Sequence, residues 1–249
     1  GQTPAHHGPA QRGTVEIRGS ATLGARISLI NEIANVAEAY GADINHVRQA
    51  VMADTRIGRD YFYPGVGFGG SCLPKDISAL AELAKERGLV SHVVEGTLST
   101  NWKQLQSFTS SLLAELGDNP SGKSVAIWGA SFKLKTGDLH NAPALAVIDR
   151  LLDAGVSVKV YDPVAGDDLR GHYGDRIAVV AKVYDALDWA DALFIATEWR
   201  EFHNPDFARM ASSMRGRTVY DGRNLYEPRL MAKHGFRYTS VGLPIVQPC

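Results

Sequence analysis

The sequence predicts an α/β protein in which an all-helical central region precedes a doubly wound, mostly parallel, Rossmann-like sheet domain. Apolar residues recur every three or four positions through much of residues 20–116, which is the period of an amphipathic helix. Short β-rich runs alternate with helical segments through residues 123–249, as in a sheet built from βαβ units. Residues 117–122, Gly-Asp-Asn-Pro-Ser-Gly, form the expected linker between the two regions.

The composition is that of a globular protein. Of the 249 residues, 45% are hydrophobic and 21% charged, with a formal net charge of -1. This balance gives no general attraction to nucleic acid or to an anionic membrane, although a local basic patch is compatible with it. No apolar run reaches membrane-spanning length, and no charged and then apolar leader opens the chain. Two cysteines, Cys72 and Cys249, make no disulfide framework, so we expect a cytoplasmic protein with a free thiol.

Residues 1–19 show neither a helical nor a strand period and are interpreted as a disordered or foreign leader. The pair His6 and His7 could ligate a metal, but the sequence offers no third ligand beside it. We therefore expect a solvated leader and no metal site.

Four helical segments are predicted in the central region. The last of them is apolar enough to pack against the first, and such a pair could also supply a two-fold subunit interface. The segments cover about residues 20–41, 45–53, 73–88 and 91–116.

Residues 66–76, with the sequence VGFGGSCLPKD, predict a reactive thiol at the start of a helix. The glycines allow tight turns and close approach to a ligand, and Pro74 suits the first turn of a helix. The positive end of the helix dipole and the Lys75 ammonium both favour the thiolate of Cys72, which is the nucleophilic form. Most isolated cysteines only fill space in a core, but a core residue needs neither the glycines nor the Lys75-Asp76 pair. Cys72 is therefore a candidate covalent nucleophile.

Six β-rich runs, with helical segments between some of them, predict the sheet domain. Ligands of a doubly wound parallel sheet bind beyond the carboxyl ends of its strands, so the residues that follow each run are candidate ligand contacts. The strands are expected at residues 124–128, 156–161, 177–180, 192–196, 218–220 and 238–241. The helices are expected at residues 142–154, 183–189 and 206–214.

Candidate ligand contacts follow three of these strands. Phe132 and Lys133 lie after the first strand, Asp162 after the second, and Arg223 after the fifth. Asp162 stands where a nucleotide-binding βαβ unit places an acid for a ribose. The loop after the first strand carries no G-x-G-x-x-G pattern, so it is a weak dinucleotide signal. Taken alone, Lys133 and Arg223 could also be solvated surface residues.

Taken in order, several motifs between residues 20 and 244 resemble the UDP-glucose/GDP-mannose dehydrogenase family, of which they cover the central and C-terminal domains only. Any one motif could arise by chance, whereas the ordered set is specific. The motifs are Arg26-Ile27-Ser28 with Asn31-Glu32, Arg56-Ile57-Gly58, residues 67–76, Phe132-Lys133 with Thr136-Gly137-Asp138, Tyr161-Asp162-Pro163, Thr197-Glu198-Trp199 with Glu201-Phe202, and Asp221-Gly222-Arg223-Asn224.

The resemblance implies an NAD-dependent nucleotide-sugar 6-dehydrogenase, with UDP-glucose as the expected substrate. In the family, two NAD molecules oxidise a sugar C6 alcohol to a carboxylate through a cysteine thiohemiacetal and a thioester. On that resemblance Cys72 is the nucleophile, Asp76 assists proton transfer and water activation, and Lys75 lies near the nicotinamide.

The resemblance also implies substrate-binding residues and a homodimer formed through the long central helix. Arg56 would reach the substrate of the neighbouring subunit, and residues 63–69 would wrap the sugar and phosphates. Phe132, Lys133 and Arg223 would hold the nucleotide. Within residues 63–69 the expected contacts are Tyr63, Gly67, Phe68 and Gly69.

Three departures from the family pattern bear on the cofactor. The family carries an NAD-binding domain ahead of the first helix, and we expect this chain to lack it and to be inactive alone. Glu16 and Ser20 stand where the family places a catalytic lysine and asparagine. A general acid such as that lysine contributes on the order of 10²–10⁴-fold in rate. His140 stands where an arginine meets the cofactor, and it is our candidate for that contact.

Three alternatives stay open. The chain could be a non-catalytic nucleotide-sugar-binding and dimerisation module, although such a module has no need of a reactive thiol. It could act on GDP-mannose or on a UDP-N-acetyl sugar, because selectivity depends on a few pocket contacts. It could also be a thiol-dependent hydrolase or transferase, for which His92 and His140 are candidate bases without a supporting spacing.

Overall fold

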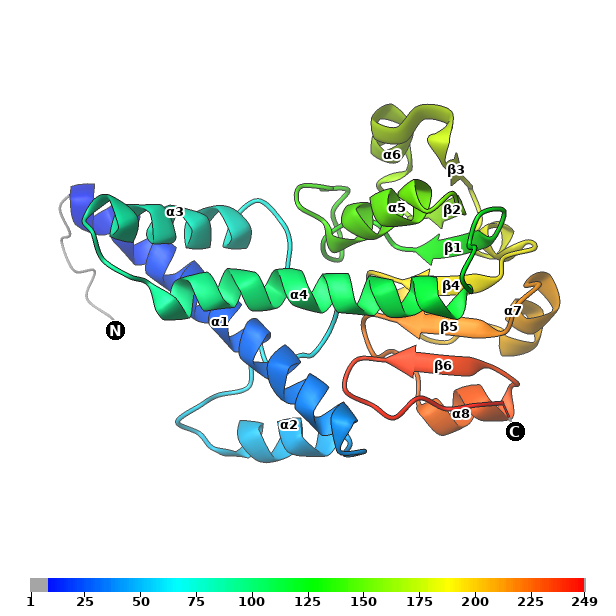
Figure 1. Ribbon diagram of the computed structural model, residues 1–249, viewed down its shortest axis with the longest axis horizontal. Helices are drawn as coiled ribbons and strands as arrows, with labels where there is room; N and C mark the ends of the chain where they lie inside the picture. Colours follow the sequence, from blue (N-terminus) through cyan, green and yellow to red (C-terminus); the bar gives the residue numbers. More distant parts are fainter. Residues whose placement is uncertain (1–8, 249) are drawn as a thin grey trace.

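The computed structural model describes residues 9–248, with side chains described from residue 17 onward. His6 and His7 of the predicted leader, and Cys249, lie outside the described residues. A helical region and a sheet domain lie side by side, and the long helix α4 runs from one onto the other (Figure 1). None of the described helices is both long and apolar enough to cross a membrane.

The helical region consists of α1 (Pro9–Ala39), α2 (Ile44–Ala53), α3 (Leu73–Glu86) and α4 (His92–Glu115). α1 packs against both α3 and α4 (Figure 1). The buried Ser28 hydroxyl on α1 donates a hydrogen bond to the Thr97 carbonyl on α4, at 2.8 Å. Asp43 caps α2 by accepting from the Asn45 N–H, at 2.7 Å. The packing of the first helix against the fourth agrees with the sequence prediction.

α1 begins at Pro9, ahead of the predicted start at Ser20. The prediction of a disordered leader is therefore wrong for residues 9–19, while residues 1–8 lie outside the described part of the chain. Adding a residue to an existing helix gains one backbone hydrogen bond without a new nucleation step. Residues that only extend a helix already packed further along its length therefore need no repeating pattern of apolar side chains.

Six strands form one parallel sheet with the order β3-β2-β1-β4-β5-β6. The order reverses between β1 and β4, where Trp128 pairs in register with Ile195. A sheet of this topology opens a ligand crevice beyond the carboxyl ends of the two strands at the reversal. The strands are β1 (Ser124–Trp128), β2 (Ser157–Tyr161), β3 (Ala178–Val179), β4 (Ala192–Ile195), β5 (Thr218–Asp221) and β6 (Arg237–Ser240).

The helices of the sheet domain agree only in part with the prediction. The segment expected as a helix at 183–189 is a 3-10 turn, η2, and α6 and α8 were not expected. Both are short and bury only two residues each, which is too few to show a helical period. The elements are α5 (Pro143–Asp153), α6 (Gly166–Tyr173), η1 (Gly174–Arg176), η2 (Val183–Leu187), η3 (Arg200–Phe202), α7 (Phe207–Ser213) and α8 (Pro228–Lys233).

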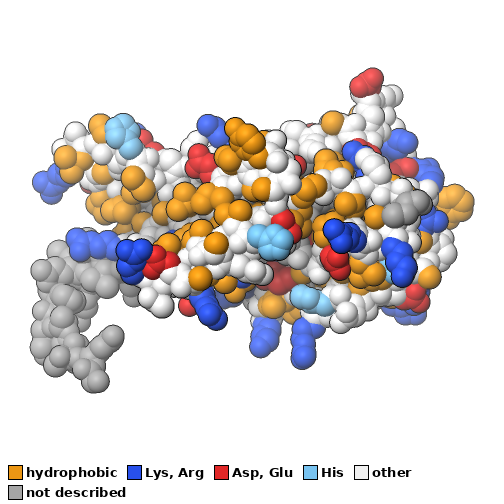
Figure 2. All heavy atoms as spheres, turned by 90° about the horizontal axis from the view of Figure 1, so that it is seen from below, with side chains coloured by type: hydrophobic (Ala, Val, Ile, Leu, Met, Phe, Trp, Pro, Cys, Tyr) orange, Lys and Arg blue, Asp and Glu red, His pale blue; other side chains and the backbone are white. Residues whose placement is uncertain are grey.

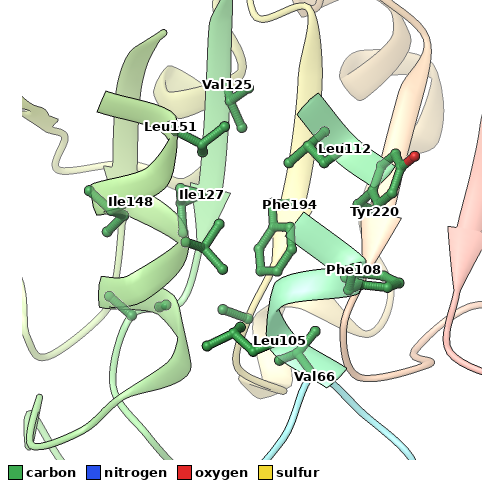
Figure 3. Close-up of a cluster of buried hydrophobic side chains, with 14 of the residues drawn as sticks. Val66, Leu105, Phe108, Leu112, Val125, Ile127, Ile148, Leu151, Phe194 and Tyr220 are labelled. Carbon is green, nitrogen blue, oxygen red and sulfur yellow. The ribbon is translucent and has the colours of Figure 1, made fainter. Parts of the chain in front are cut away.

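One face of the sheet shares its core with the helical region. Phe108 of α4 makes edge contacts with Phe194 and Tyr220, with ring centroids 5.9 and 5.4 Å apart (Figure 3). Leu112, one turn further along α4, is fully buried in the same cluster. Val66, in the glycine-rich loop of residues 65–70, lies at the edge of this cluster (Figure 3). The loop that leads to Cys72 is therefore anchored in the core that joins the two regions.

Candidate functional site

A cavity of about 740 Å³ lies where the helical region meets the carboxyl ends of the strands. One wall is helical and comes from α1 and the loop before α3, while the other consists of residues that follow β1, β4 and β5. The cavity therefore forms only when both regions are folded. The helical wall consists of Ser20, Leu23, Ile27, Asp60, Tyr61, Tyr63, Gly65 and residues 67–73. The sheet wall consists of Phe132, Lys133, Thr136, Asp138, Glu198 and Arg223.

Hydrogen bonds from both regions hold the glycine loop, residues 65–70. The side chain of Asn101 on α4 acts as a clamp, because it accepts from the Phe68 N–H at 2.7 Å and donates to the Phe68 carbonyl at 3.0 Å. On its other side the loop is joined to the sheet domain, where the Gly70 N–H donates to the His140 carbonyl at 2.9 Å. The loop thus has a fixed conformation before any ligand enters.

Two of the loop glycines allow it to touch the sheet domain. A Cβ atom at Gly69 would lie 2.1 Å from the carbonyl oxygen of Asn141. One at Gly70, which has a φ of +89°, would lie 2.7 Å from the ring of Phe132. Glycine is required at both positions because a side chain would force the two regions apart.

Cys72 lies at the N-cap position of α3, is exposed and lines the cavity. Its Sγ atom is 3.7 Å from the Ser71 hydroxyl. One turn later, the Asp76 carboxylate accepts a hydrogen bond from the Ser20 hydroxyl at 2.7 Å, across the α1 and α3 pair. Lys75 lies 3.9 Å from Asp76, with three quarters of its side chain exposed, and neither residue lines the cavity.

The structure brings most of the predicted substrate contacts together. All of the following line the cavity with Cys72: Tyr63, Gly67, Phe68, Gly69, Phe132, Lys133 and Arg223. Their expected roles stay predictions, but their position around one cavity agrees with contact to one ligand.

Besides Lys75 and Asp76, the predicted binding residues Arg56 and His140 do not line the cavity. The Arg56 side chain is 85% exposed and pairs with Asp54, so it does not reach the cavity of its own chain. His140 is exposed and hydrogen-bonded to Asp138 at 3.0 Å, beside a second hollow of about 540 Å³ formed with Val164 and Asp168. His92, a candidate base for the hydrolase alternative, begins α4 and does not line the main cavity.

Asp162 does not have the role that the sequence suggested. Its carboxylate accepts from the N–H groups of four residues, from the Ser131 hydroxyl and from the Trp199 indole. Burial raises the pKa of Asp162, but these donors together outweigh it and hold the pKa below its usual value. Asp162 fixes the loops after β1 and β2, and it has no free capacity for a ribose.

Glu198, for which the sequence predicted no role, follows β4 and lines the cavity. Its Oε2 atom lies 3.1 Å from Nε of Arg223, and that Nε donates to the Ala196 carbonyl at 2.7 Å. The signal that could have identified Glu198 is its place beyond a strand at the reversal of the sheet. Ser20, noted only as a departure from the family pattern, is the hydrogen-bond partner of Asp76.

The described residues contain no dinucleotide-binding fingerprint that follows a β-strand. Gly65, Gly67 and Gly70 have the G-x-G-x-x-G spacing, but no β-strand leads into them, as a dinucleotide loop requires. The N–H groups of Ala130 and Ser131, after β1, are already bonded to Asp162 and offer no open phosphate cradle. Nor does any cluster of three His, Cys, Asp or Glu side chains in the described part of the chain suit a metal ion.

Each of the two regions matches a domain of one known protein family. Residues 15–103 match the central domain of the UDP-glucose/GDP-mannose dehydrogenase family, and residues 126–228 match its UDP binding domain. The first match begins inside α1, at a residue that the sequence analysis assigned to the leader.

Similar proteins agree with these domain matches. A UDP-glucose 6-dehydrogenase of Pseudomonas aeruginosa is 38% identical over 235 residues, which are 92% of this chain and 52% of that protein. One of Bacillus subtilis is 36% identical, over 94% of this chain and 50% of its own length. The solved structure of a UDP-glucose dehydrogenase from Pyrobaculum islandicum has a TM-score of 0.79 at 33% identity, over 87% of this chain and 48% of that one.

The chain thus spans about half the length of the curated relatives that it matches. The two domain matches lie in the order and at the positions of the helical region and the sheet domain described above. The chain belongs to the UDP-glucose/GDP-mannose dehydrogenase family, of which it contains the central domain and the UDP-binding domain.

Proposed function

We propose that this chain supplies the covalent and nucleotide-sugar-binding half of a nucleotide-sugar 6-dehydrogenase that acts on UDP-glucose. The observation that carries the proposal is the cavity in which Cys72 lies together with Lys133 and Arg223. A thiol on one wall and two cations on the other suit a ligand with a reactive carbon at one end and a diphosphate further along. Relatives named as UDP-glucose 6-dehydrogenases support the choice of substrate.

The sheet wall binds the nucleotide part of this ligand. Lys133 offers a compact point charge, and Arg223 offers a planar fork of donors suited to phosphate oxygens. The ring of Phe132, also on this wall, provides an apolar face for the base. Because these groups stand on loops fixed by Asp162 and Asp221, they are oriented before the ligand arrives.

On the helical wall, the Cys72 thiolate adds to the C6 carbon of the sugar aldehyde. A carbon–sulfur bond forms, the carbonyl electron pair moves to oxygen, and that oxygen takes a proton to give a thiohemiacetal. In the last step water adds to the thioester carbon, the carbon–sulfur bond breaks, and the thiolate leaves. Asp76, held by Ser20, accepts a proton from that water. The oxidation between these steps needs a nicotinamide acceptor, and it is not assigned to the described residues.

Calorimetric titration tests the proposal on the 249-residue protein. UDP-glucose is expected to bind more tightly than GDP-mannose or UDP-N-acetylglucosamine, and Arg223→Ala is expected to weaken binding at least tenfold, since it removes a charged phosphate contact. Arg229→Ala is the matched control, because Arg229 is exposed and does not line the cavity. Tighter binding of GDP-mannose would move the assignment to that substrate, and no nucleotide binding at all would overturn the proposal. With NAD and UDP-glucose present, this protein alone is expected to form no NADH.

A second candidate, a nucleotide-sugar-binding module without catalysis, is favoured by one observation. Ser20, not asparagine, is the partner of Asp76, and Glu16 stands at the position of the family lysine, in the part of α1 whose side chains are not described. UDP-glucose C6-aldehyde labelled with ¹³C at C6 separates the two functions. A thiohemiacetal ¹³C signal that disappears in Cys72→Ser supports catalysis, whereas the aldehyde hydrate alone supports the module.

We also propose a homodimer formed through α1 and α4. Figure 2 shows hydrophobic side chains gathered over the helical half of one face. Four large apolar residues of α1 and α4 are at least half exposed: Leu29, Val36, Val93 and Trp102. Light scattering after gel filtration should give twice the chain mass, and Val93→Asp should give the monomer. A monomeric wild type would contradict the dimer, and with it the role of Arg56 in a neighbouring cavity. A cytoplasmic location stays a prediction from the sequence.

A further inference from the structure

The carboxylate of Glu198 carries a buried oxygen without a hydrogen-bond donor. Glu198 lines the cavity and its side chain is 38% exposed, yet its Oε2 atom is buried. Arg223 places Nε 3.1 Å from Oε2, but the single hydrogen of that nitrogen is directed at the Ala196 carbonyl. Among the described residues, Oε2 therefore has a charge partner and no donor. A ligand cannot reach Oε2, because that atom is buried. Oε1 is not among the buried atoms and accepts no hydrogen bond from a described residue, so a ligand hydroxyl or N–H that reaches Oε1 gains a hydrogen bond to a charged acceptor.

The other acidic groups near this end of the cavity are already occupied or solvated. Asp162 accepts six hydrogen bonds and does not line the cavity. Asp138 lines it but accepts from the backbone and the ring of His140, at 2.8 and 3.0 Å. Asp60 is exposed and belongs to the helical wall. Glu198 is thus the carboxylate of the sheet wall that is open to a ligand.

The place of Glu198 in the fold decides which part of the ligand it meets. It follows β4, next to β1, at the reversal where a parallel sheet binds its ligand. Lys133 and Arg223 flank it from the loops after β1 and β5, and both attract phosphate. With the sugar C6 at Cys72 on the helical wall and the diphosphate at these cations, the sheet wall faces the nucleoside. A phosphate is repelled by a carboxylate, whereas the O–H groups of a vicinal diol can donate to the lone pairs of Oε1.

We infer that Glu198 accepts hydrogen bonds from the ribose 2′ and 3′ hydroxyls of the bound nucleotide and thereby selects ribonucleoside over 2′-deoxyribonucleoside diphosphates. The inference rests on the proposed nucleotide-sugar function and assigns the ribose recognition that Asp162 cannot provide. Arg223 compensates the charge of Glu198, while the two terminal nitrogens of its guanidinium stay available for phosphate.

Titration of UDP and 2′-deoxy-UDP into the wild type and into Glu198→Gln tests the inference. The wild type should prefer UDP by on the order of tenfold, since a hydrogen bond to a charged acceptor is at stake. Glu198→Gln should reduce this preference to about threefold or less, and Glu198→Ala should remove it. Glu201→Gln is the matched control and should keep the wild-type preference, because Glu201 binds the Tyr161 hydroxyl away from the cavity. Circular dichroism checks that each variant is folded.

Two results would overturn the inference alone: equal binding of both nucleotides by the wild type, or an unchanged preference in a folded Glu198→Ala protein. If Glu198→Gln weakens both nucleotides by the same factor, Glu198 only orients Arg223 and the inference is also wrong. If the wild type binds neither nucleotide, the proposed nucleotide-sugar function fails together with this inference. The wild-type titration therefore separates the two failures before any variant is made.

Discussion

The two walls of the cavity are built in different ways. On the helical wall Cys72 is exposed, and the Asp76 carboxylate beside it has a single side-chain hydrogen bond, from Ser20. On the sheet wall the binding groups stand on loops that buried carboxylates hold. Asp162 accepts six hydrogen bonds, and the fully buried Asp221 accepts from the backbone of the turn that carries Arg223. Substitutions on the sheet wall should therefore disturb stability and binding together, whereas substitution of Ser20 or Cys72 on the helical wall should affect chemistry alone.

The largest expected loss of stability comes from a substitution in the core that the helical region shares with the sheet domain. Leu112→Ala removes a fully buried side chain of α4 from the shared core, next to Phe194 and Tyr220 (Figure 3). It should lower the free energy of unfolding by about 3 kcal/mol, through lost burial and a residual cavity. Urea denaturation measures this, with Leu83→Ala, at a 44% exposed position, as a control expected within about 0.5 kcal/mol of wild type. A loss below 1 kcal/mol would show that α4 does not join the regions.

The second-largest loss of stability is expected on the sheet wall. Asp162→Asn replaces an acceptor of six hydrogen bonds with a side chain that points two donors at other donors, and it should cost about 2 kcal/mol. Because its pKa is lowered in the folded protein, ionised Asp162 contributes stability that is fully present above its unfolded-state value near pH 4. That contribution is lost as the pH falls through the lower folded-state pKa.

The free energy of unfolding, measured by urea denaturation between pH 7 and pH 2.5, should therefore fall less steeply toward acid pH for Asp162→Asn than for wild type. Asp167→Asn is the control, since the Asp167 side chain is fully exposed. If the free energy of unfolding falls equally steeply toward acid pH in wild type and in Asp162→Asn, the loop donors do not stabilise the carboxylate.

A smaller effect is expected at Tyr238, whose hydroxyl donates to the buried Asp221 carboxylate at 2.8 Å. Burial raises the pKa of Asp221, so this donor compensates part of the cost of the buried group. Tyr238→Phe should lower the free energy of unfolding by about 1.5 kcal/mol and weaken UDP binding, because the turn carrying Arg223 loosens. Tyr40→Phe, at an 86% exposed position, should change neither. Unchanged UDP binding in Tyr238→Phe would show that the turn is held independently.

The smallest effect on stability is expected on the helical wall. Ser20→Ala removes the hydroxyl that holds Asp76, so it should change the free energy of unfolding by less than about 0.5 kcal/mol. After Cys72 is acetylated with p-nitrophenyl acetate, mass spectrometry should show deacylation about tenfold slower in Ser20→Ala, through a misplaced general base. Thr22→Ala, an exposed hydroxyl on the same helix, is the control. Equal deacylation rates would remove Ser20 from the mechanism.

The features that local sequence determines were predictable. β1 has its predicted bounds, and the VGFGGSCLPKD stretch forms a loop and a helix start. Glycine permits backbone conformations that other residues rarely adopt, whereas proline and β-branched residues restrict theirs. Residues 67–73, half of the helical wall, could therefore be identified from this one stretch of sequence.

The sheet wall could be predicted only in part. Asp162 has the sequence position of a ribose ligand, but the N–H groups of Ala130 and Ser131, more than thirty residues earlier, turn it into a structural residue. The position of Glu198 after a strand can be read from the sequence, but the lack of a donor for its Oε2 atom cannot, since Arg223 directs the hydrogen of its Nε at the Ala196 carbonyl. Contacts between distant residues decide such roles, and no spacing rule within one segment contains them.

The central claim is that one ligand reaches both walls at once, with its phosphates at Arg223 and its sugar at Cys72. Alkylation of Cys72 by iodoacetamide, followed by peptide mass spectrometry, tests it most directly. UDP-glucose at ten times its Kd should slow alkylation about tenfold, because the bound sugar covers the thiol. The same UDP-glucose concentration should protect Arg223→Ala far less. An alkylation rate of Cys72 that does not change when UDP-glucose saturates the wild type would contradict the account.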